Sequence, residues 1–131
     1  MRNIVIIGGG AAGLMAAIAA KRDNTKITVI EKNSRPARKV MITGKGRCNV
    51  TNAVTGNEFL ANVVHGAKFM LSSETRFNSS DTMHFFEELG VSLKIERGNR
   101  VFPVSDKSSD IIDALLHRKM PLRRQSYIGS D

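Results

Sequence analysis

The first thirty residues alternate between β-branched apolar runs and an alanine-rich stretch. Residues 4–7 are consecutive Ile and Val side chains, which predict a strand packed on both faces. Residues 14–20 are rich in alanine and predict a helix. After a polar break at residues 21–24, residues 27–30 predict a second strand. The order strand, helix, strand predicts a βαβ unit with parallel strands.

Further along the chain the pattern predicts short helices and one hairpin. The helices are predicted at residues 57–67, 68–72, 79–89 and 107–117. Asn78 or Ser79 is the expected N-cap of the third helix, and Gly90 is its expected stop. Residues 91–96 and 100–102 flank an Arg-Gly-Asn turn and predict the hairpin.

A glycine-rich turn connects the first strand to the first helix. Gly8, Gly10 and Gly13 fit the spacing G-x-G-x-x-G. The first glycine allows a tight turn, the second lets a pyrophosphate approach the backbone, and the third lets the helix pack closely on the strand. Glycines with this spacing between a strand and a helix favour a dinucleotide site over a glycine-rich turn of another α/β protein.

An acidic residue follows the second strand at the position this interpretation requires. Glu31 lies eighteen residues after Gly13, close to the separation of roughly 20 at which a carboxylate accepts hydrogen bonds from a ribose 2′-hydroxyl. A carboxylate there would repel a 2′-phosphate. The site therefore favours NAD, or the adenosine half of FAD, over NADP.

The net charge of +8 is concentrated near this site. Residues 1–56 contain ten Lys and Arg but only two acids, Asp23 and Glu31, whereas the rest of the chain is balanced. We expect this positive field to lie where the phosphates of a cofactor bind. A nucleic-acid patch is the competing interpretation, but the segment lacks interleaved aromatic residues, so a nucleic-acid partner is not expected.

Residues 43–52, TGKGRCNVTN, form a second glycine-rich loop with many hydrogen-bonding side chains. Its glycines would let the backbone approach a ligand, and Arg47 offers a planar donor fork for a phosphate. Asn49, Thr51 and Asn52 can both donate and accept hydrogen bonds. The alternative is an ordinary surface turn stabilised by Asn and Thr side chains.

Several of these segments resemble one family of bacterial flavoproteins. Residues 4–13, Val29-Ile30-Glu31-Lys32, Arg38-Lys39, the 43–52 loop and the later segment GNRVFPVSD at 98–106 are similar to the N-terminal part of the BaiN/YhiN-type proteins, also known as the aminoacetone oxidase family. The resemblance covers nearly all of residues 1–117. It implies an α/β fold, a Rossmann-like FAD-binding βαβ unit with an appended helical and hairpin segment, and an incomplete FAD-binding domain.

The same resemblance implies that the cofactor is FAD, with NAD(P)H as a conceivable reductant, and that the protein is an oxidoreductase. It assigns the cofactor contacts to residues of both glycine-rich segments and the stretch between them: Gly8, Gly10, Ala11, Ala12, Gly13, Glu31, Lys32, Arg38, Lys39, Gly46, Arg47, Cys48, Asn49 and Thr51. A thiol beside Arg47 could act as a nucleophile with a lowered pKa. Because no second cysteine is present, a packing or flavin-wall role is favoured for Cys48.

The cysteine content and the N-terminal apolar stretch indicate the expected location of the protein, and the sequence also suggests how the chain is divided. A single cysteine suits the cytoplasm, and the glycine-broken N-terminal apolar stretch favours neither a signal peptide nor a membrane span. We expect a unit at 1–56, its helical and hairpin continuation at 57–117, and a disordered tail at 118–131 that departs from the family pattern, as in a truncated or frame-shifted product. No metal site and no catalytic acid or base is identified, and the substrate is unknown. A catalytically inactive nucleotide-binding fragment is the alternative function.

Overall fold

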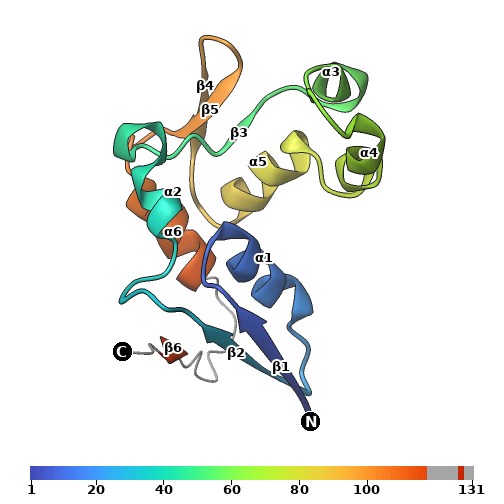
Figure 1. Ribbon diagram of the computed structural model, residues 1–131. Helices are drawn as coiled ribbons and strands as arrows, with labels where there is room; N and C mark the ends of the chain where they lie inside the picture. Colours follow the sequence, from blue (N-terminus) through green and yellow to red (C-terminus); the bar gives the residue numbers. More distant parts are fainter. Residues whose placement is uncertain (118–126, 129–131) are drawn as a thin grey trace.

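The computed structural model describes residues 1–117 and 127–128. Strand β1 (Arg2–Ile7), helix α1 (Ala11–Ala20) and strand β2 (Thr25–Ile30) follow one another at the start of the chain. The two strands pair in parallel over their whole length, from Arg2 opposite Thr25 to Ile7 opposite Ile30. Helix α1 packs beside them (Figure 1). The predicted βαβ unit is confirmed.

Strand β1 is covered on one face only, so the prediction of burial on both faces was wrong for the described part of the chain. Ile4 and Ile6 are half-buried, whereas the side chains of Val5 and Ile7 are 58% and 77% exposed. Successive side chains of a strand point to opposite faces, and α1 packs against one of them. The continuous apolar run therefore alternates between a covered and an exposed face.

A second, antiparallel sheet has the strand order β3-β5-β4. Strands β4 (Leu93–Glu96) and β5 (Arg100–Pro103) form the predicted hairpin, with Ile95 opposite Val101. The turn between them places Gly98 and Asn99 at φ +74° and +57°, a region that glycine and asparagine tolerate best. Strand β3 (Thr51–Asn52), which the sequence analysis did not predict, pairs with β5.

Helices connect and cover the two sheets. Helices α5 (Ser79–Glu88) and α6 (Ser108–His117) match the predicted segments. Helix α3 (Gly56–Ala61) ends six residues before the end of the predicted 57–67 helix, and α4 (Ala67–Arg76) extends four residues beyond the predicted 68–72 helix. The Asn78 side chain accepts from the Asp81 N–H and the Asp81 carboxylate accepts from the Asn78 N–H, a capping box that begins α5 where the sequence predicts. Two short elements lie between β2 and β3. They are the helix α2 (Arg38–Ile42) and the 3₁₀ turn η1 (Thr43–Gly46).

The core lies where α1, α2, α5 and α6 meet. Its most buried side chains include Leu14 of α1, Phe86 of α5, and Ile111 and Leu115 of α6. Helix α6 packs against both α1 and α2, as the ribbon shows (Figure 1). This packing brings the N-terminus of α1 next to the loop that follows α2, so the two glycine-rich segments face one site.

The predicted tail is described only at Tyr127–Ile128. These residues form strand β6, which pairs in parallel with Val29 and Ile30 of β2, although the sequence analysis expects no strand here. The rest of the expected disordered tail, residues 118–126 and 129–131, lies outside the described residues. Among the described helices, none has the length and apolar character needed to cross a bilayer.

Candidate functional site

The first glycine-rich turn is tight on its inner side and open on its outer side. Gly8 has a φ of +98°, and its N–H donates to the carbonyl oxygen of Ile30 (2.7 Å), which ties the turn to the end of β2. A Cβ on Gly13 would overlap the carbonyl oxygen of Gly8. A Cβ on Gly10 would meet no atom within 4 Å. The lack of a side chain at Gly10 therefore leaves the backbone accessible from outside.

The accessible side of the turn is the N-terminus of α1. This helix of ten residues begins after Gly10, which has no side chain to cap it, and its first turn contains no acidic residue. Ala11 and Ala12 are exposed. The N–H groups of a first helical turn lack intrahelical partners, and the helix dipole adds positive potential there. The turn thus fits a phosphate or pyrophosphate group.

Glu31 lies directly beside this turn. One carboxylate oxygen accepts from the Gly9 N–H (2.7 Å), and the other accepts from the backbone and side-chain N–H groups of Asn33 (2.8 and 2.7 Å). The backbone hydrogen bond from Asn33, followed by that from Gly9, lowers the pKa of Glu31. The carboxylate is therefore ionised and fixed, and it is half-buried. Its three hydrogen bonds leave acceptor capacity for a further donor such as a ribose hydroxyl.

Asn33 is a site residue that the sequence analysis missed. Besides donating to Glu31, its side-chain oxygen accepts from Arg38 Nη1 (3.2 Å). The available signal was an asparagine two residues after an acid in a turn, where such side chains bond to neighbouring groups. Ala37, at φ +58°, donates its N–H to the Gly9 carbonyl (2.8 Å) and begins α2 against the glycine turn.

A mostly apolar pocket of about 460 Å³ opens beside the start of α1. Among the predicted site residues, it is lined by Ala11, Ala12, Lys39, Cys48 and Asn49. Apolar residues of α1, α2, α5 and α6 complete its wall, with Phe77 and Phe85 in edge-to-face contact at 6.4 Å between ring centroids. Such a pocket suits the apolar part of a flat aromatic ring system.

The second glycine-rich loop is bonded mainly to the hairpin. The Val50 N–H donates to the Val101 carbonyl (2.8 Å), and the Asn52 amide donates to the Gly98 carbonyl (2.8 Å). The Asn49 amide, oriented to satisfy its neighbours, donates to the carbonyls of Thr51 (3.0 Å) and Val101 (3.2 Å). The family resemblance assigned Asn49 to the cofactor, whereas Asn52 was expected only to donate and accept hydrogen bonds. The structure gives both amides protein partners, and the contact of Asn49 with a cofactor stays a prediction.

Arg47 is also bonded to protein groups. Its Nη1 lies 2.9 Å from a Glu96 carboxylate oxygen and 3.3 Å from an Asp106 carboxylate oxygen. The pKa of Arg47 is raised, chiefly by the hydrogen bond to Glu96. Its expected contact with a phosphate remains a prediction.

Cys48 is a core residue as well as a pocket residue. It is buried at 5% exposure, adopts a φ of +60°, and belongs to the cluster that includes Leu14 and Phe86. Burial raises the pKa of its thiol, and a hydrogen bond with Thr43 offsets only part of this effect. The raised pKa disfavours a thiolate nucleophile beside Arg47, and the burial is that of a packing residue. The place of Cys48 in a flavin wall stays a prediction.

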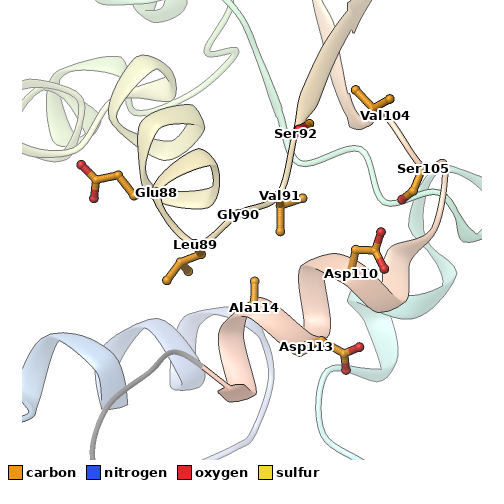
Figure 2. A pocket seen from close by; sticks show the side chains of 10 residues that line it. All are labelled: Glu88, Leu89, Gly90, Val91, Ser92, Val104, Ser105, Asp110, Asp113 and Ala114. Carbon is orange, nitrogen blue, oxygen red and sulfur yellow. The ribbon is translucent and has the colours of Figure 1, made fainter.

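The other large depression, of about 850 Å³, lies between the C-terminal end of α5, the end of β5 and α6. No predicted site residue lines it. Figure 2 shows that its acidic side chains Glu88, Asp110 and Asp113 do not converge on one point. Three carboxylates would also repel the phosphates of a dinucleotide. The smaller pocket beside α1 is therefore the candidate site.

Comparison with known proteins agrees with this geometry. Residues 2–126 match the family model described as the HI0933-like protein Rossmann domain. The chain is 36% identical, over 129 residues, to a 3-dehydro-bile acid delta(4,6)-reductase of Clostridium scindens. It is 29% identical over 115 residues to a ribosomal RNA dihydrouridine synthase of Escherichia coli, and 33% identical over 99 residues to that of Haemophilus influenzae.

These alignments cover most of this chain but a small part of each relative. They include 95%, 87% and 75% of this chain, and 30%, 28% and 24% of the respective relatives. The chain therefore corresponds to less than a third of the length of these proteins.

Proposed function

Since the chain belongs to the HI0933-like Rossmann-domain family, we propose that it is the FAD-binding portion of a flavin-dependent oxidoreductase. The observation that carries the proposal is the open approach to Gly10 at an uncapped helix N-terminus, with a fixed carboxylate beside it. A pyrophosphate fits the first feature and a ribose fits the second.

Two groups of residues would hold the cofactor. Gly8, Gly10, Ala11, Ala12 and Gly13 would bind the pyrophosphate through backbone N–H groups and the α1 dipole. Glu31 would accept from the adenosine ribose. The exposed cations of the adjoining segment would offset the phosphate charge: Lys32, Arg38 and Lys39.

The flavin side would lie at the apolar pocket beside α1. Cys48 and Asn49 line that pocket, and Thr51 and Gly46 belong to the same loop. The buried thiol supplies a neutral wall, because its raised pKa keeps it protonated. When bound, the flavin would supply the redox chemistry, and the chain would supply binding and orientation.

The relatives support only a broad reaction class. Their names denote a reductase of a bile acid and synthases that act on ribosomal RNA, so they differ in substrate. We propose the shared class, an oxidoreductase with NAD(P)H as a candidate reductant, and leave the substrate unassigned.

The test is to purify the chain, add FAD and measure binding by equilibrium dialysis and the visible flavin spectrum. We expect a yellow complex that releases FAD on denaturation, with FAD bound more tightly than NADP. A folded chain that takes up no FAD would contradict the proposal. Bound FAD that NAD(P)H does not reduce would indicate the alternative, a nucleotide-binding fragment without activity. Salt-dependent RNA binding without flavin would favour the basic nucleic-acid interpretation.

A further inference from the structure

The loop that contains Arg47 and the β4–β5 hairpin, which are distant in the sequence, meet around the Arg47 side chain. Its Nη1 contacts both oxygens of Glu96 (2.9 and 3.1 Å), at the end of β4, and one oxygen of Asp106 (3.3 Å), which follows β5. Its guanidinium carbon lies 4.0 Å from the centroid of the Phe102 ring of β5. Arg47 thus contacts two side chains of the hairpin and one of the segment that follows it, with charge-assisted hydrogen bonds and a cation–π contact.

Lys94 completes the cluster and balances its charge. Its Nζ lies 2.8 Å from Asp106 and 3.4 Å from Glu96. The cluster therefore contains two cations and two carboxylates. An arginine whose charge is compensated by carboxylates has little net attraction left for a phosphate.

The loop segment next to Arg47 packs closely on the hairpin. Phe102 is 2% exposed, and a Cβ on Gly44 would lie 2.9 Å from its ring, so only glycine fits at this contact. The Arg47 N–H donates to the Gly44 carbonyl (3.3 Å), and the Cys48 N–H donates to the Thr43 carbonyl (3.0 Å). The backbone from Thr43 to Cys48 is thereby closed into a turn against the Phe102 ring.

The next residues along the chain line the pocket beside α1. Cys48 and Asn49 follow Arg47 directly, and both belong to the pocket wall. We propose that Arg47 is a positioning residue, which holds the 43–49 segment against the hairpin through Glu96, Asp106 and Phe102 and so sets the pocket wall without contacting the dinucleotide. The inference rests on the proposed function as far as FAD is the ligand of that pocket.

A double substitution separates this role from a direct phosphate contact. Glu96→Gln with Asp106→Asn removes both charged partners of Arg47, and asparagine tolerates the φ of +57° at position 106. If Arg47 positions the loop, FAD binding weakens by about tenfold or more, comparable to the loss when a side chain that orients a metal ligand is removed. If Arg47 binds a phosphate directly, the freed guanidinium leaves FAD binding unchanged or tighter.

A second readout needs no flavin. Cys48 is the single cysteine of the chain and is buried next to Arg47, so its alkylation rate reports whether the segment stays closed. We expect the double variant to react about tenfold faster than the wild type, with an unchanged far-ultraviolet circular dichroism spectrum. This result stands even if the wild-type chain binds no FAD, so the two proposals can fail separately.

Glu88→Gln with Asp113→Asn is the matched control. It makes the same charge change at two exposed acids of the other depression, and it should alter neither FAD binding nor alkylation. If the double variant at the cluster fails to fold, Glu96→Gln alone should give smaller changes of the same sign. Wild-type FAD affinity and a protected Cys48 in a folded cluster variant would overturn the inference.

Discussion

Gly10 and Gly13 lie one helical turn apart but have opposite surroundings. A side chain at Gly13 would overlap the Gly8 carbonyl inside the turn, whereas a side chain at Gly10 would enter open space where a ligand would approach. Gly13 is therefore needed for the fold of the turn, whereas Gly10 leaves the backbone open on the side where we propose that the pyrophosphate binds. At the residue scale, the surroundings of the two glycines separate a structural requirement from a proposed binding role within one motif.

We predict opposite outcomes for the two alanine substitutions. Gly13→Ala should lower the free energy of unfolding by about 2 kcal/mol or more, because the overlap is with rigid backbone. Elsewhere in a helix the same change stabilises by up to about 1 kcal/mol. Gly10→Ala should change stability by less than about 1 kcal/mol. It should weaken FAD binding about tenfold, which corresponds to a steric cost of roughly 1.4 kcal/mol.

Urea denaturation and equilibrium dialysis measure the two effects. If Gly13→Ala were as stable as the wild type, the turn would differ from the one described. If Gly10→Ala bound FAD normally, the approach of the pyrophosphate to this residue would be excluded.

At the scale of elements, the 43–52 loop and the β4–β5 hairpin form one structural unit. Two of the segments that carry the family resemblance, TGKGRCNVTN at 43–52 and GNRVFPVSD at 98–106, are in contact through Arg47 and Phe102. Hydrogen bonds and the ion-pair cluster link the two segments, so a substitution in one segment should alter the conformation or stability of the other.

This cluster predicts a stability that falls in acid. Lys94 holds the pKa of Asp106 below its usual value, and Arg47 does the same for Glu96. A carboxyl group with a lowered folded-state pKa stabilises the fold above its unfolded-state pKa of roughly 4, and that stability is lost as the pH falls through the folded-state pKa. The cluster thus stabilises at neutral pH and ceases to do so in acid.

The measurement is the urea midpoint of wild type and Glu96→Gln/Asp106→Asn between neutral pH and about pH 3. We expect the wild type to be more stable at neutral pH and the difference to shrink in acid. Glu31 titrates in both proteins, so it does not affect the difference. If the difference in urea midpoint between the two proteins did not depend on pH, the ion pairs would contribute nothing to the stability of the fold.

At the scale of the whole molecule, the described sheet has an exposed apolar face at its edge. Val5 and Ile7 lie on one face of β1, and β1 is the outer strand in the order β1-β2-β6. An edge strand with exposed apolar residues is a site for association between chains. The surface contrasts with the basic surroundings of the glycine turn, where charge keeps chains apart.

We therefore predict concentration-dependent self-association of the isolated chain. Size-exclusion chromatography with light scattering should show oligomers at micromolar to millimolar concentrations, about the range in which exposed strand edges associate. Val5→Lys/Ile7→Lys should shift the chain toward monomer. The control Val64→Lys/Phe69→Lys adds the same charge at two apolar residues that lie away from the sheet and are each 86% exposed. This control should leave the self-association unchanged. A wild type that stays monomeric throughout would refute the prediction.

Local patterns in the sequence were sufficient to predict most elements. The β-branched runs, the alanine-rich helix, the Asn78 cap and the hairpin depend on neighbouring residues, and the structure has each of them. The glycine spacing and Glu31 were also predictable, because the end of β2 and the turn after β1 are adjacent in any parallel βαβ unit. These features follow from steric and hydrogen-bonding preferences within about thirty residues.

The partners of the second loop were decided only by the tertiary structure. The sequence determined that Arg47, Asn49 and Asn52 are strong hydrogen-bonding groups, but a donor can bind a ligand or a neighbouring strand equally well. Folding places the hairpin, some fifty residues away, against this loop, so Glu96 and the hairpin carbonyls become the partners. In the same way, only the packing of α1 on one face of β1 decided which of its apolar side chains are half-buried and which are exposed.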